Sequence, residues 1–163
     1  MGGALAVASV AIAFFAMVIA FLALWWSRRT WRASLEQNRR DMFLALHEKL
    51  SSSEQQSGRR ILREKINSLR DAQVMRRKKP QDLRLVVSAL GMMDILGLYV
   101  EKDFVDEQLV FEEWGPLLAE ILPSGVHVIE ERRQNGGSGR RLWPHFRRLA
   151  LAATAWVEQQ NAR

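Results

Sequence analysis

The sequence predicts an all-α protein, with a single N-terminal transmembrane helix followed by a small cytoplasmic helical bundle. Three observations lead to this fold class. Residues 4–26 form an uncharged apolar run in which Ser9 is the only hydroxyl side chain. The rest of the 163-residue chain carries apolar side chains at helical spacing. The alternating pattern typical of strands is not found in the sequence.

The apolar run of residues 4–26 has the length of a membrane-spanning helix. At about 1.5 Å per residue it spans about 34 Å, enough for a hydrocarbon core about 30 Å thick. A helix also satisfies its own backbone hydrogen bonds in lipid. A cleaved signal peptide is the alternative, but it would need a basic start and a shorter apolar core. We therefore expect an uncleaved anchor.

The residues that follow the run predict its orientation. Trp25 and Trp26 suit a membrane interface, where an indole contacts both lipid and headgroup water. Three interface arginines come next, namely Arg28, Arg29 and Arg32. The positive-inside rule then places residues 1–3 outside the membrane and the C-terminal domain in the cytoplasm. The expected location is the bacterial inner membrane.

Small residues in the apolar run raise the possibility of a homo-oligomer. Ala4 and Ala8, and then Ala16 and Ala20, have the four-residue spacing that allows two helices to approach closely. Ile12 interrupts this row, and alanine is frequent throughout the run. Chance therefore explains the spacing as well as self-association does.

Charge is distributed in three blocks. Residues 1–80 hold fifteen Lys/Arg and six Asp/Glu, residues 81–131 hold two and eleven, and residues 132–163 hold seven and one. The net charges are therefore +9, −9 and +6, which together give the overall +6. This segregation predicts that the acidic middle packs beside the basic flanks within one domain.

Helical periodicity divides the remainder into a juxtamembrane amphipathic helix at 27–50 and a helical domain at 51–163. Within that domain, Ser52 or Ser53 can cap a helix over 53–72, residues 82–100 suit a central buried helix, and Asp106 can cap the next. We expect Gly115-Pro116 to kink or split that helix and Pro123 to end it. The final helices are expected over 125–134 and from Pro144 onward.

A basic run, Arg76, Arg77, Lys78 and Lys79, ends at Pro80. It predicts either contact with an anionic partner or a solvated loop between helices, and the lack of interleaved aromatic residues favours the loop.

Asp94 is a carboxylate within the most apolar helix of the domain. We expect it to accept hydrogen bonds from an arginine or a neighbouring helix end, and a functional role is the alternative.

Motifs that carry chemistry are weak. The chain has no cysteine, which excludes disulfides, thiolate metal sites and cysteine nucleophiles. Its histidines are scattered, and His127 with Glu130 or Glu131 falls short of a zinc motif. The glycines of residues 134–139 lack the lysine spacing of a phosphate-binding loop. We therefore predict no catalytic residue, no metal and no cofactor.

Residues 91–149 resemble a bacterial family known as domain of unknown function 4760. The matching residues are Asp94, Gly97-Leu98-Tyr99-Val100, Phe104-Val105-Asp106, Trp114-Gly115-Pro116, Glu131-Arg132-Arg133 and Phe146. Similar proteins commonly begin with a membrane helix. The resemblance implies a helical, membrane-tethered cytoplasmic domain, and it supplies no activity.

These features predict a non-enzymatic, membrane-tethered interaction or scaffolding module. Its expected partners are the lipid bilayer and a protein at the membrane. The alternative is a protein that binds nucleic acid or anionic lipid through its basic segments. The sequence does not choose between lipid, nucleic acid and the acidic middle as the contact of those segments.

Overall fold

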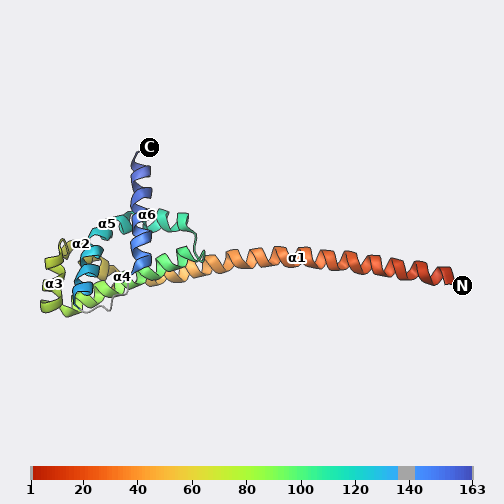
Figure 1. Ribbon diagram of the computed structural model, residues 1–163, viewed down its shortest axis with the longest axis horizontal. Coiled ribbons are helices and arrows are strands. Elements are labelled where there is room, and N and C mark those ends of the chain that lie inside the picture. The colour runs from red at the N-terminus through yellow and green to blue at the C-terminus, as the bar shows by residue number, and fades with distance from the viewer. Residues whose placement is uncertain (1, 136–141, 163) are drawn as a thin grey trace. The chain divides into compact units, whose positions relative to one another are not determined.

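The computed structural model describes the backbone of residues 2–135 and 142–162, and the side chains of residues 17, 19–27, 34, 37–135 and 142–162. The described chain is all-α and contains no strand. Figure 1 shows its helices, which are α1 (Gly2–Leu50), α2 (Ser53–Lys65), α3 (Leu69–Lys78), α4 (Pro80–Glu101), α5 (Glu107–Gln134) and α6 (Pro144–Asn161).

Helix α1 passes through the junction of two compact units, residues 1–40 and residues 41–163. It covers both the predicted membrane segment and the predicted juxtamembrane helix without a break. The sequence of residues 4–50 offers no Gly or Pro that would interrupt the helix. Side chains of the predicted span are described only at residues 17 and 19–26, so the membrane prediction stays a prediction.

The core of the second unit is built from every one of its helices. Leu46 and Leu50 of α1 are buried in it, and α4 packs against both α2 and α6. The largest fully buried side chains include Leu62, Leu90 and Phe146. Burying side chains of this size contributes about 1.5–3 kcal/mol each, which makes this core the main source of stability.

Where we predicted one helix over 53–72, the chain forms two, so that prediction was wrong. Helix α2 ends at Lys65, and Ser68 begins α3 by accepting the N–H of Asp71 with its hydroxyl group. The Asp71 carboxylate accepts in return from the Ser68 hydroxyl and the Asn67 N–H. This reciprocal cap competes successfully with helix continuation.

The basic run does not lie in a loop, and the preference for a loop was wrong. Arg76, Arg77 and Lys78 form the last turn of α3, and Pro80 begins α4 directly after Lys79. Cations suit this position because the carbonyl end of a helix carries partial negative charge. Proline suits the first position of a helix because no hydrogen bond is required of its nitrogen.

Helix α4 is the one described helix with the length and composition of a membrane span, judged on described residues only. Val86, Leu90 and Met93 are fully buried against the other helices of the second unit. Helix α4 is therefore the central helix of the bundle, as we predicted for residues 82–100.

Helix α5 is continuous from Glu107 to Gln134, although it contains Pro116 and Pro123. The predicted break at Pro123 and the separate helix over 125–134 were therefore wrong. Each proline removes one backbone donor, but buried residues on both sides keep the helix in register. Gly115 lies against the Trp156 ring of α6, and Gly125 lies against the Phe146 ring.

The ion pairs confirm that the acidic middle packs beside the basic flanks. Each pair found among the described residues joins residues 81–131 to one of the flanking blocks. Examples are Arg63 with Glu120 at 3.2 Å and Arg148 with Glu101 at 2.6 Å. The segregated charge of the sequence is thus neutralised partly within the fold.

Candidate functional site

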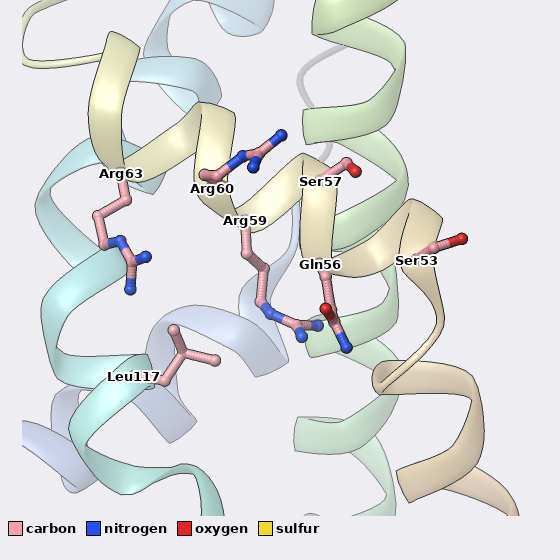
Figure 2. A pocket seen from close by; sticks show the side chains of 7 residues that line it. All are labelled: Ser53, Gln56, Ser57, Arg59, Arg60, Arg63 and Leu117. Carbon is pink, nitrogen blue, oxygen red and sulfur yellow. The ribbon is translucent and has the colours of Figure 1, made fainter.

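An open pocket of about 400 Å³ lies between α2 and α5. Its lining consists of Ser53, Gln56, Ser57, Arg59, Arg60, Arg63 and Leu117. Figure 2 shows Arg59 and Arg63 extending from the same side of α2, whereas Arg60 points the other way. The four-residue spacing of Arg59 and Arg63 on a helix explains why they share a face.

Arg59 is the unusual residue of this pocket because only 7% of it is exposed. Its Nη1 donates to the Leu50 carbonyl at the end of α1 at 2.7 Å. Its guanidinium lies over the Trp114 ring, 5.2 Å from the ring centroid. Burial lowers the pKa of Arg59, and the positive charge of Arg63 lowers it further. The guanidinium still carries its charge at neutral pH.

No carboxylate among the described residues forms an ion pair with Arg59. Buried charges are ordinarily paired, since removing a charge from water is costly. The carbonyl end of α1 offsets part of the charge through its partial negative charge. Among the described residues, however, no group with a full negative charge is paired with Arg59.

Arg63 is half-exposed and pairs with Glu120 of α5. Gln56 uses its amide nitrogen to donate to the Ser51 carbonyl at 2.7 Å. The pocket therefore offers guanidinium, hydroxyl and amide groups beside the apolar side chain of Leu117. The seven described residues that line it include no carboxylate or imidazole, so this lining is suited to binding an anion and not to proton transfer.

The four residues of the basic run differ in whether they form an ion pair within the fold. Arg76 donates to the buried Glu131 carboxylate at 3.0 Å. Arg77, Lys78 and Lys79 are exposed, and the described residues provide no ion pair to them. Of the four residues that we predicted as a possible contact with an anionic partner, Arg76 is thus paired within the fold, and the contact itself stays a prediction.

Asp94 lies on α4 and is only partly buried. Its Oδ1 accepts the backbone N–H groups of His145 and Phe146, both at 2.9 Å. These donors belong to the first turn of α6, whose preceding residue, Trp143, has a φ of 47° and provides no side-chain cap. Asp94 thus supplies the cap of α6 from a neighbouring helix.

A cluster of charged groups surrounds the same helix end. The Glu101 carboxylate accepts from the Arg148 guanidinium at 2.6 and 2.8 Å, and the His145 Nδ1 lies 2.9 Å from the same carboxylate. The hydrogen bond from Arg148 is the main reason that the pKa of Glu101 lies below its ordinary value. This cluster joins α4 to α6 at the surface.

Glu131 is the buried carboxylate that the sequence analysis missed. It is 0% exposed, whereas Asp94, the predicted candidate, is partly buried. Its Oε1 accepts from Arg76 and from Asn135, and its Oε2 has no hydrogen-bond partner among the described atoms. The sequence signal for the burial of Glu131 was the basic run at residues 76–79, which lies more than fifty residues earlier in the chain.

His127, Glu130 and Glu131, which fall short of a zinc motif in the sequence, belong to no group of three or more His, Asp or Glu able to hold an ion among the described residues. Glu130 instead contacts Arg133 and Gln134 of its own helix.

Trp25 and Trp26 are largely exposed on α1. The side chains of Arg28, Arg29 and Arg32, and the glycine-rich segment 136–139, lie outside the described residues.

Fold and site together define an all-α protein with an arginine-lined pocket in its helical domain. A family model described as "Domain of unknown function (DUF4760)" matches residues 6–154. The chain belongs to this family, as its resemblance had indicated. The searches of curated proteins and of solved structures gave no match.

Proposed function

We propose that the protein is a non-enzymatic interaction module tethered to the bacterial inner membrane by its N-terminal helix. One observation supports the tether above all others. Large apolar side chains of α1 are exposed at the described positions of the apolar run, including Ile19, Phe21 and Leu24. Leaving side chains of this size in water costs about 1.5–3 kcal/mol each, and a lipid environment would remove that cost.

The flanking residues support the proposed topology. Trp25 and Trp26 stand where an aromatic belt would lie, and the sequence that follows is rich in arginine. On the positive-inside rule, this arrangement leaves residues 27–163 in the cytoplasm. The proposed anchor would thereby hold the helical domain close to partners at the membrane.

The proposed contact with a partner protein is the exposed end of α3. Arg77, Lys78 and Lys79 project from one helix end, and Arg76 beside them is fixed by Glu131. An acidic surface on the partner would complement them and speed encounter. We infer binding and not catalysis because the residues that line the pocket between α2 and α5 suit anion binding better than proton transfer.

The tether is tested by washing membranes that contain the full chain with alkaline carbonate. Retention in the pellet supports the proposal, and release contradicts it. A reporter fused after Arg163 should be active in the cytosol, and activity outside would contradict the orientation.

The partner contact is tested by chemical crosslinking in intact membranes, with the double reversal Lys78→Glu/Lys79→Glu. The matched control is Arg84→Glu/Lys102→Glu, which reverses an exposed cation of α4 and the exposed cation at its C-terminal cap. We expect the crosslinked species to disappear only with the first variant. Equal yields from both variants would exclude the end of α3 as the contact.

Binding of nucleic acid or anionic lipid is a second candidate function, because the same three exposed cations suit phosphate groups. Arg59, Arg63, Arg76 and Arg148 already have internal contacts, which reduces the basic surface on which this alternative depends. A filter-binding assay over a range of salt concentrations distinguishes the two, since phosphate contacts give a steep salt dependence.

A further inference from the structure

We propose that the pocket between α2 and α5 binds a phosphate group carried by a small organic ligand. Arg59 and Arg63 would be its charged donors, and Leu117 would contact the carbon skeleton. This site is separate from the exposed end of α3 that we propose for a protein partner. The failure of either proposal leaves the other intact.

The first argument is the state of Arg59. Arg59, of which only 7% is exposed, lines the pocket without a carboxylate partner among the described residues. The Leu50 carbonyl takes one of its five N–H groups, and the Trp114 ring covers one face. Donors remain for an anion that enters from the pocket, and a bound anion would supply the missing negative charge.

The second argument is the pairing of two like charges. Arg59 and Arg63 are four residues apart on one helix, a spacing at which like charges repel. Figure 2 shows both extending from the same side of α2. An anion between them would convert this repulsion into two favourable contacts. Glu120 neutralises only the outer, half-exposed arginine.

The third argument concerns the chemical class of the ligand. A phosphate monoester presents several oxygens in the geometry that guanidinium groups bind with paired hydrogen bonds. Ser53, Ser57 and Gln56 add neutral polar groups around it. A volume of about 400 Å³ lies at the lower end of the range for small-molecule sites, so a small phosphate ester fits.

The test is calorimetric titration of the full chain in detergent micelles with glycerol 3-phosphate and with inorganic phosphate. We expect saturable binding that Arg63→Gln weakens at least about tenfold, the loss expected for one charge-assisted hydrogen bond. Glu120→Gln should tighten binding, because it frees Arg63 and removes a competing negative charge. These opposite effects distinguish a site from general electrostatic attraction.

Two matched controls on α2 complete the design. Lys65→Gln removes one positive charge, as Arg63→Gln does, and Glu64→Gln removes one negative charge, as Glu120→Gln does. Both control residues are exposed and lie outside the pocket lining. Both should leave the affinity within about twofold of the wild type. If Lys65→Gln weakens binding as much as Arg63→Gln, the proposal is overturned. Arg59→Lys, checked for folding by circular dichroism, should also weaken binding because lysine lacks the planar fork.

Vesicles of phosphatidylcholine with and without phosphatidic acid identify the source of the phosphate. Binding of glycerol 3-phosphate in solution supports a soluble ester. Binding that requires phosphatidic acid and is lost with Arg63→Gln supports a lipid headgroup. If neither the soluble phosphates nor phosphatidic acid binds, the pocket is not a phosphate site.

Discussion

Helix α4 and the predicted span at residues 4–26 of α1 are both long and apolar, and their described side chains are placed differently. In α4, Val86, Leu90 and Met93 are fully buried among the helices of the second unit. In α1, the described side chains of the predicted span are exposed, and Phe21 reaches 70%. Apolarity alone therefore does not distinguish a core helix from a helix that needs another environment.

The polar residues distinguish them. Ser88 of α4 accepts a hydrogen bond from Gln55 of α2 at 2.9 Å, and Asp94 of α4 caps α6. Both are positioned for partners within the protein. Residues 4–26 contain no charge and one hydroxyl side chain, so they offer almost nothing for such partners. A core helix thus differs from a span in where its few polar residues find hydrogen bonds.

The largest expected difference between the two stretches comes from placing an arginine in each and measuring the stability of the domain. Met93→Arg puts an unpaired cation in the core, and we expect loss of the folded domain because the cost approaches the total stability of a small domain. Phe21→Arg should leave the unfolding transition of the domain unchanged. Thermal unfolding followed by circular dichroism measures both. A cooperative transition in Met93→Arg would refute the burial of this helix.

Two adjacent residues of α4 give the next largest effect. Leu96 is buried, whereas Ile95 is exposed on the same helix. Leu96→Ala should cost about 2–5 kcal/mol of unfolding free energy, and Ile95→Ala should cost well under half of that. Denaturant titrations compare the two. Equal losses would indicate that the exposed face of α4 is covered in the intact protein.

Asp94 provides a smaller effect that tests its capping role. Asp94→Ala removes the acceptor of two backbone N–H groups at the start of α6 and should cost about 1–2 kcal/mol. Asp94→Asn retains an oxygen acceptor and should cost less. Hydrogen exchange of the His145 and Phe146 amides should accelerate in the alanine variant. Unchanged exchange would show that another group satisfies them.

The smallest effect is a pH dependence at Glu101, the last residue of α4. Because Arg148, and secondarily His145, lower the pKa of Glu101 in the folded state, its ionised form stabilises the fold above the ordinary pKa of glutamate, about 4.3. That stability is lost as the pH falls through the lowered value. Urea midpoints should therefore fall more steeply with acid in the wild type than in Glu101→Gln.

Glu158→Gln is the control for this measurement. It changes an exposed glutamate of α6 that has no ion pair among the described residues. Its acid profile should follow that of the wild type. Parallel profiles for Glu101→Gln and the wild type would show that the pairing with Arg148 has no effect on stability.

Local signals were sufficient to predict much of the fold. The all-α class, the central helix and the caps at Ser52 and Asp106 all follow from periodicity and from short polar side chains at helix starts. The same local reasoning failed where tertiary contacts decide the outcome. Packing against Trp156 and Phe146 carries α5 through two prolines that the sequence suggested would interrupt it.

The candidate site was less predictable than the fold. Arg59 has three cationic neighbours on α2, a pattern typical of the solvated side of a helix. Only the fold reveals that it meets Leu50 and Trp114, which come from the end of α1 and from α5. The Gln55 side chain likewise donates to Ser88 of α4, 33 residues further along the chain. Long-range partners of this kind leave no local signal.

The joining of basic flanks to an acidic middle has a consequence during synthesis of the chain. The first 80 residues leave the ribosome with a surplus of nine positive charges. Arg63, Lys65 and Arg76 gain their carboxylate partners only after residues 82–131 have emerged. The nascent chain therefore remains strongly cationic until most of the domain has been made, so α2 and α3 complete their pairing late in translation.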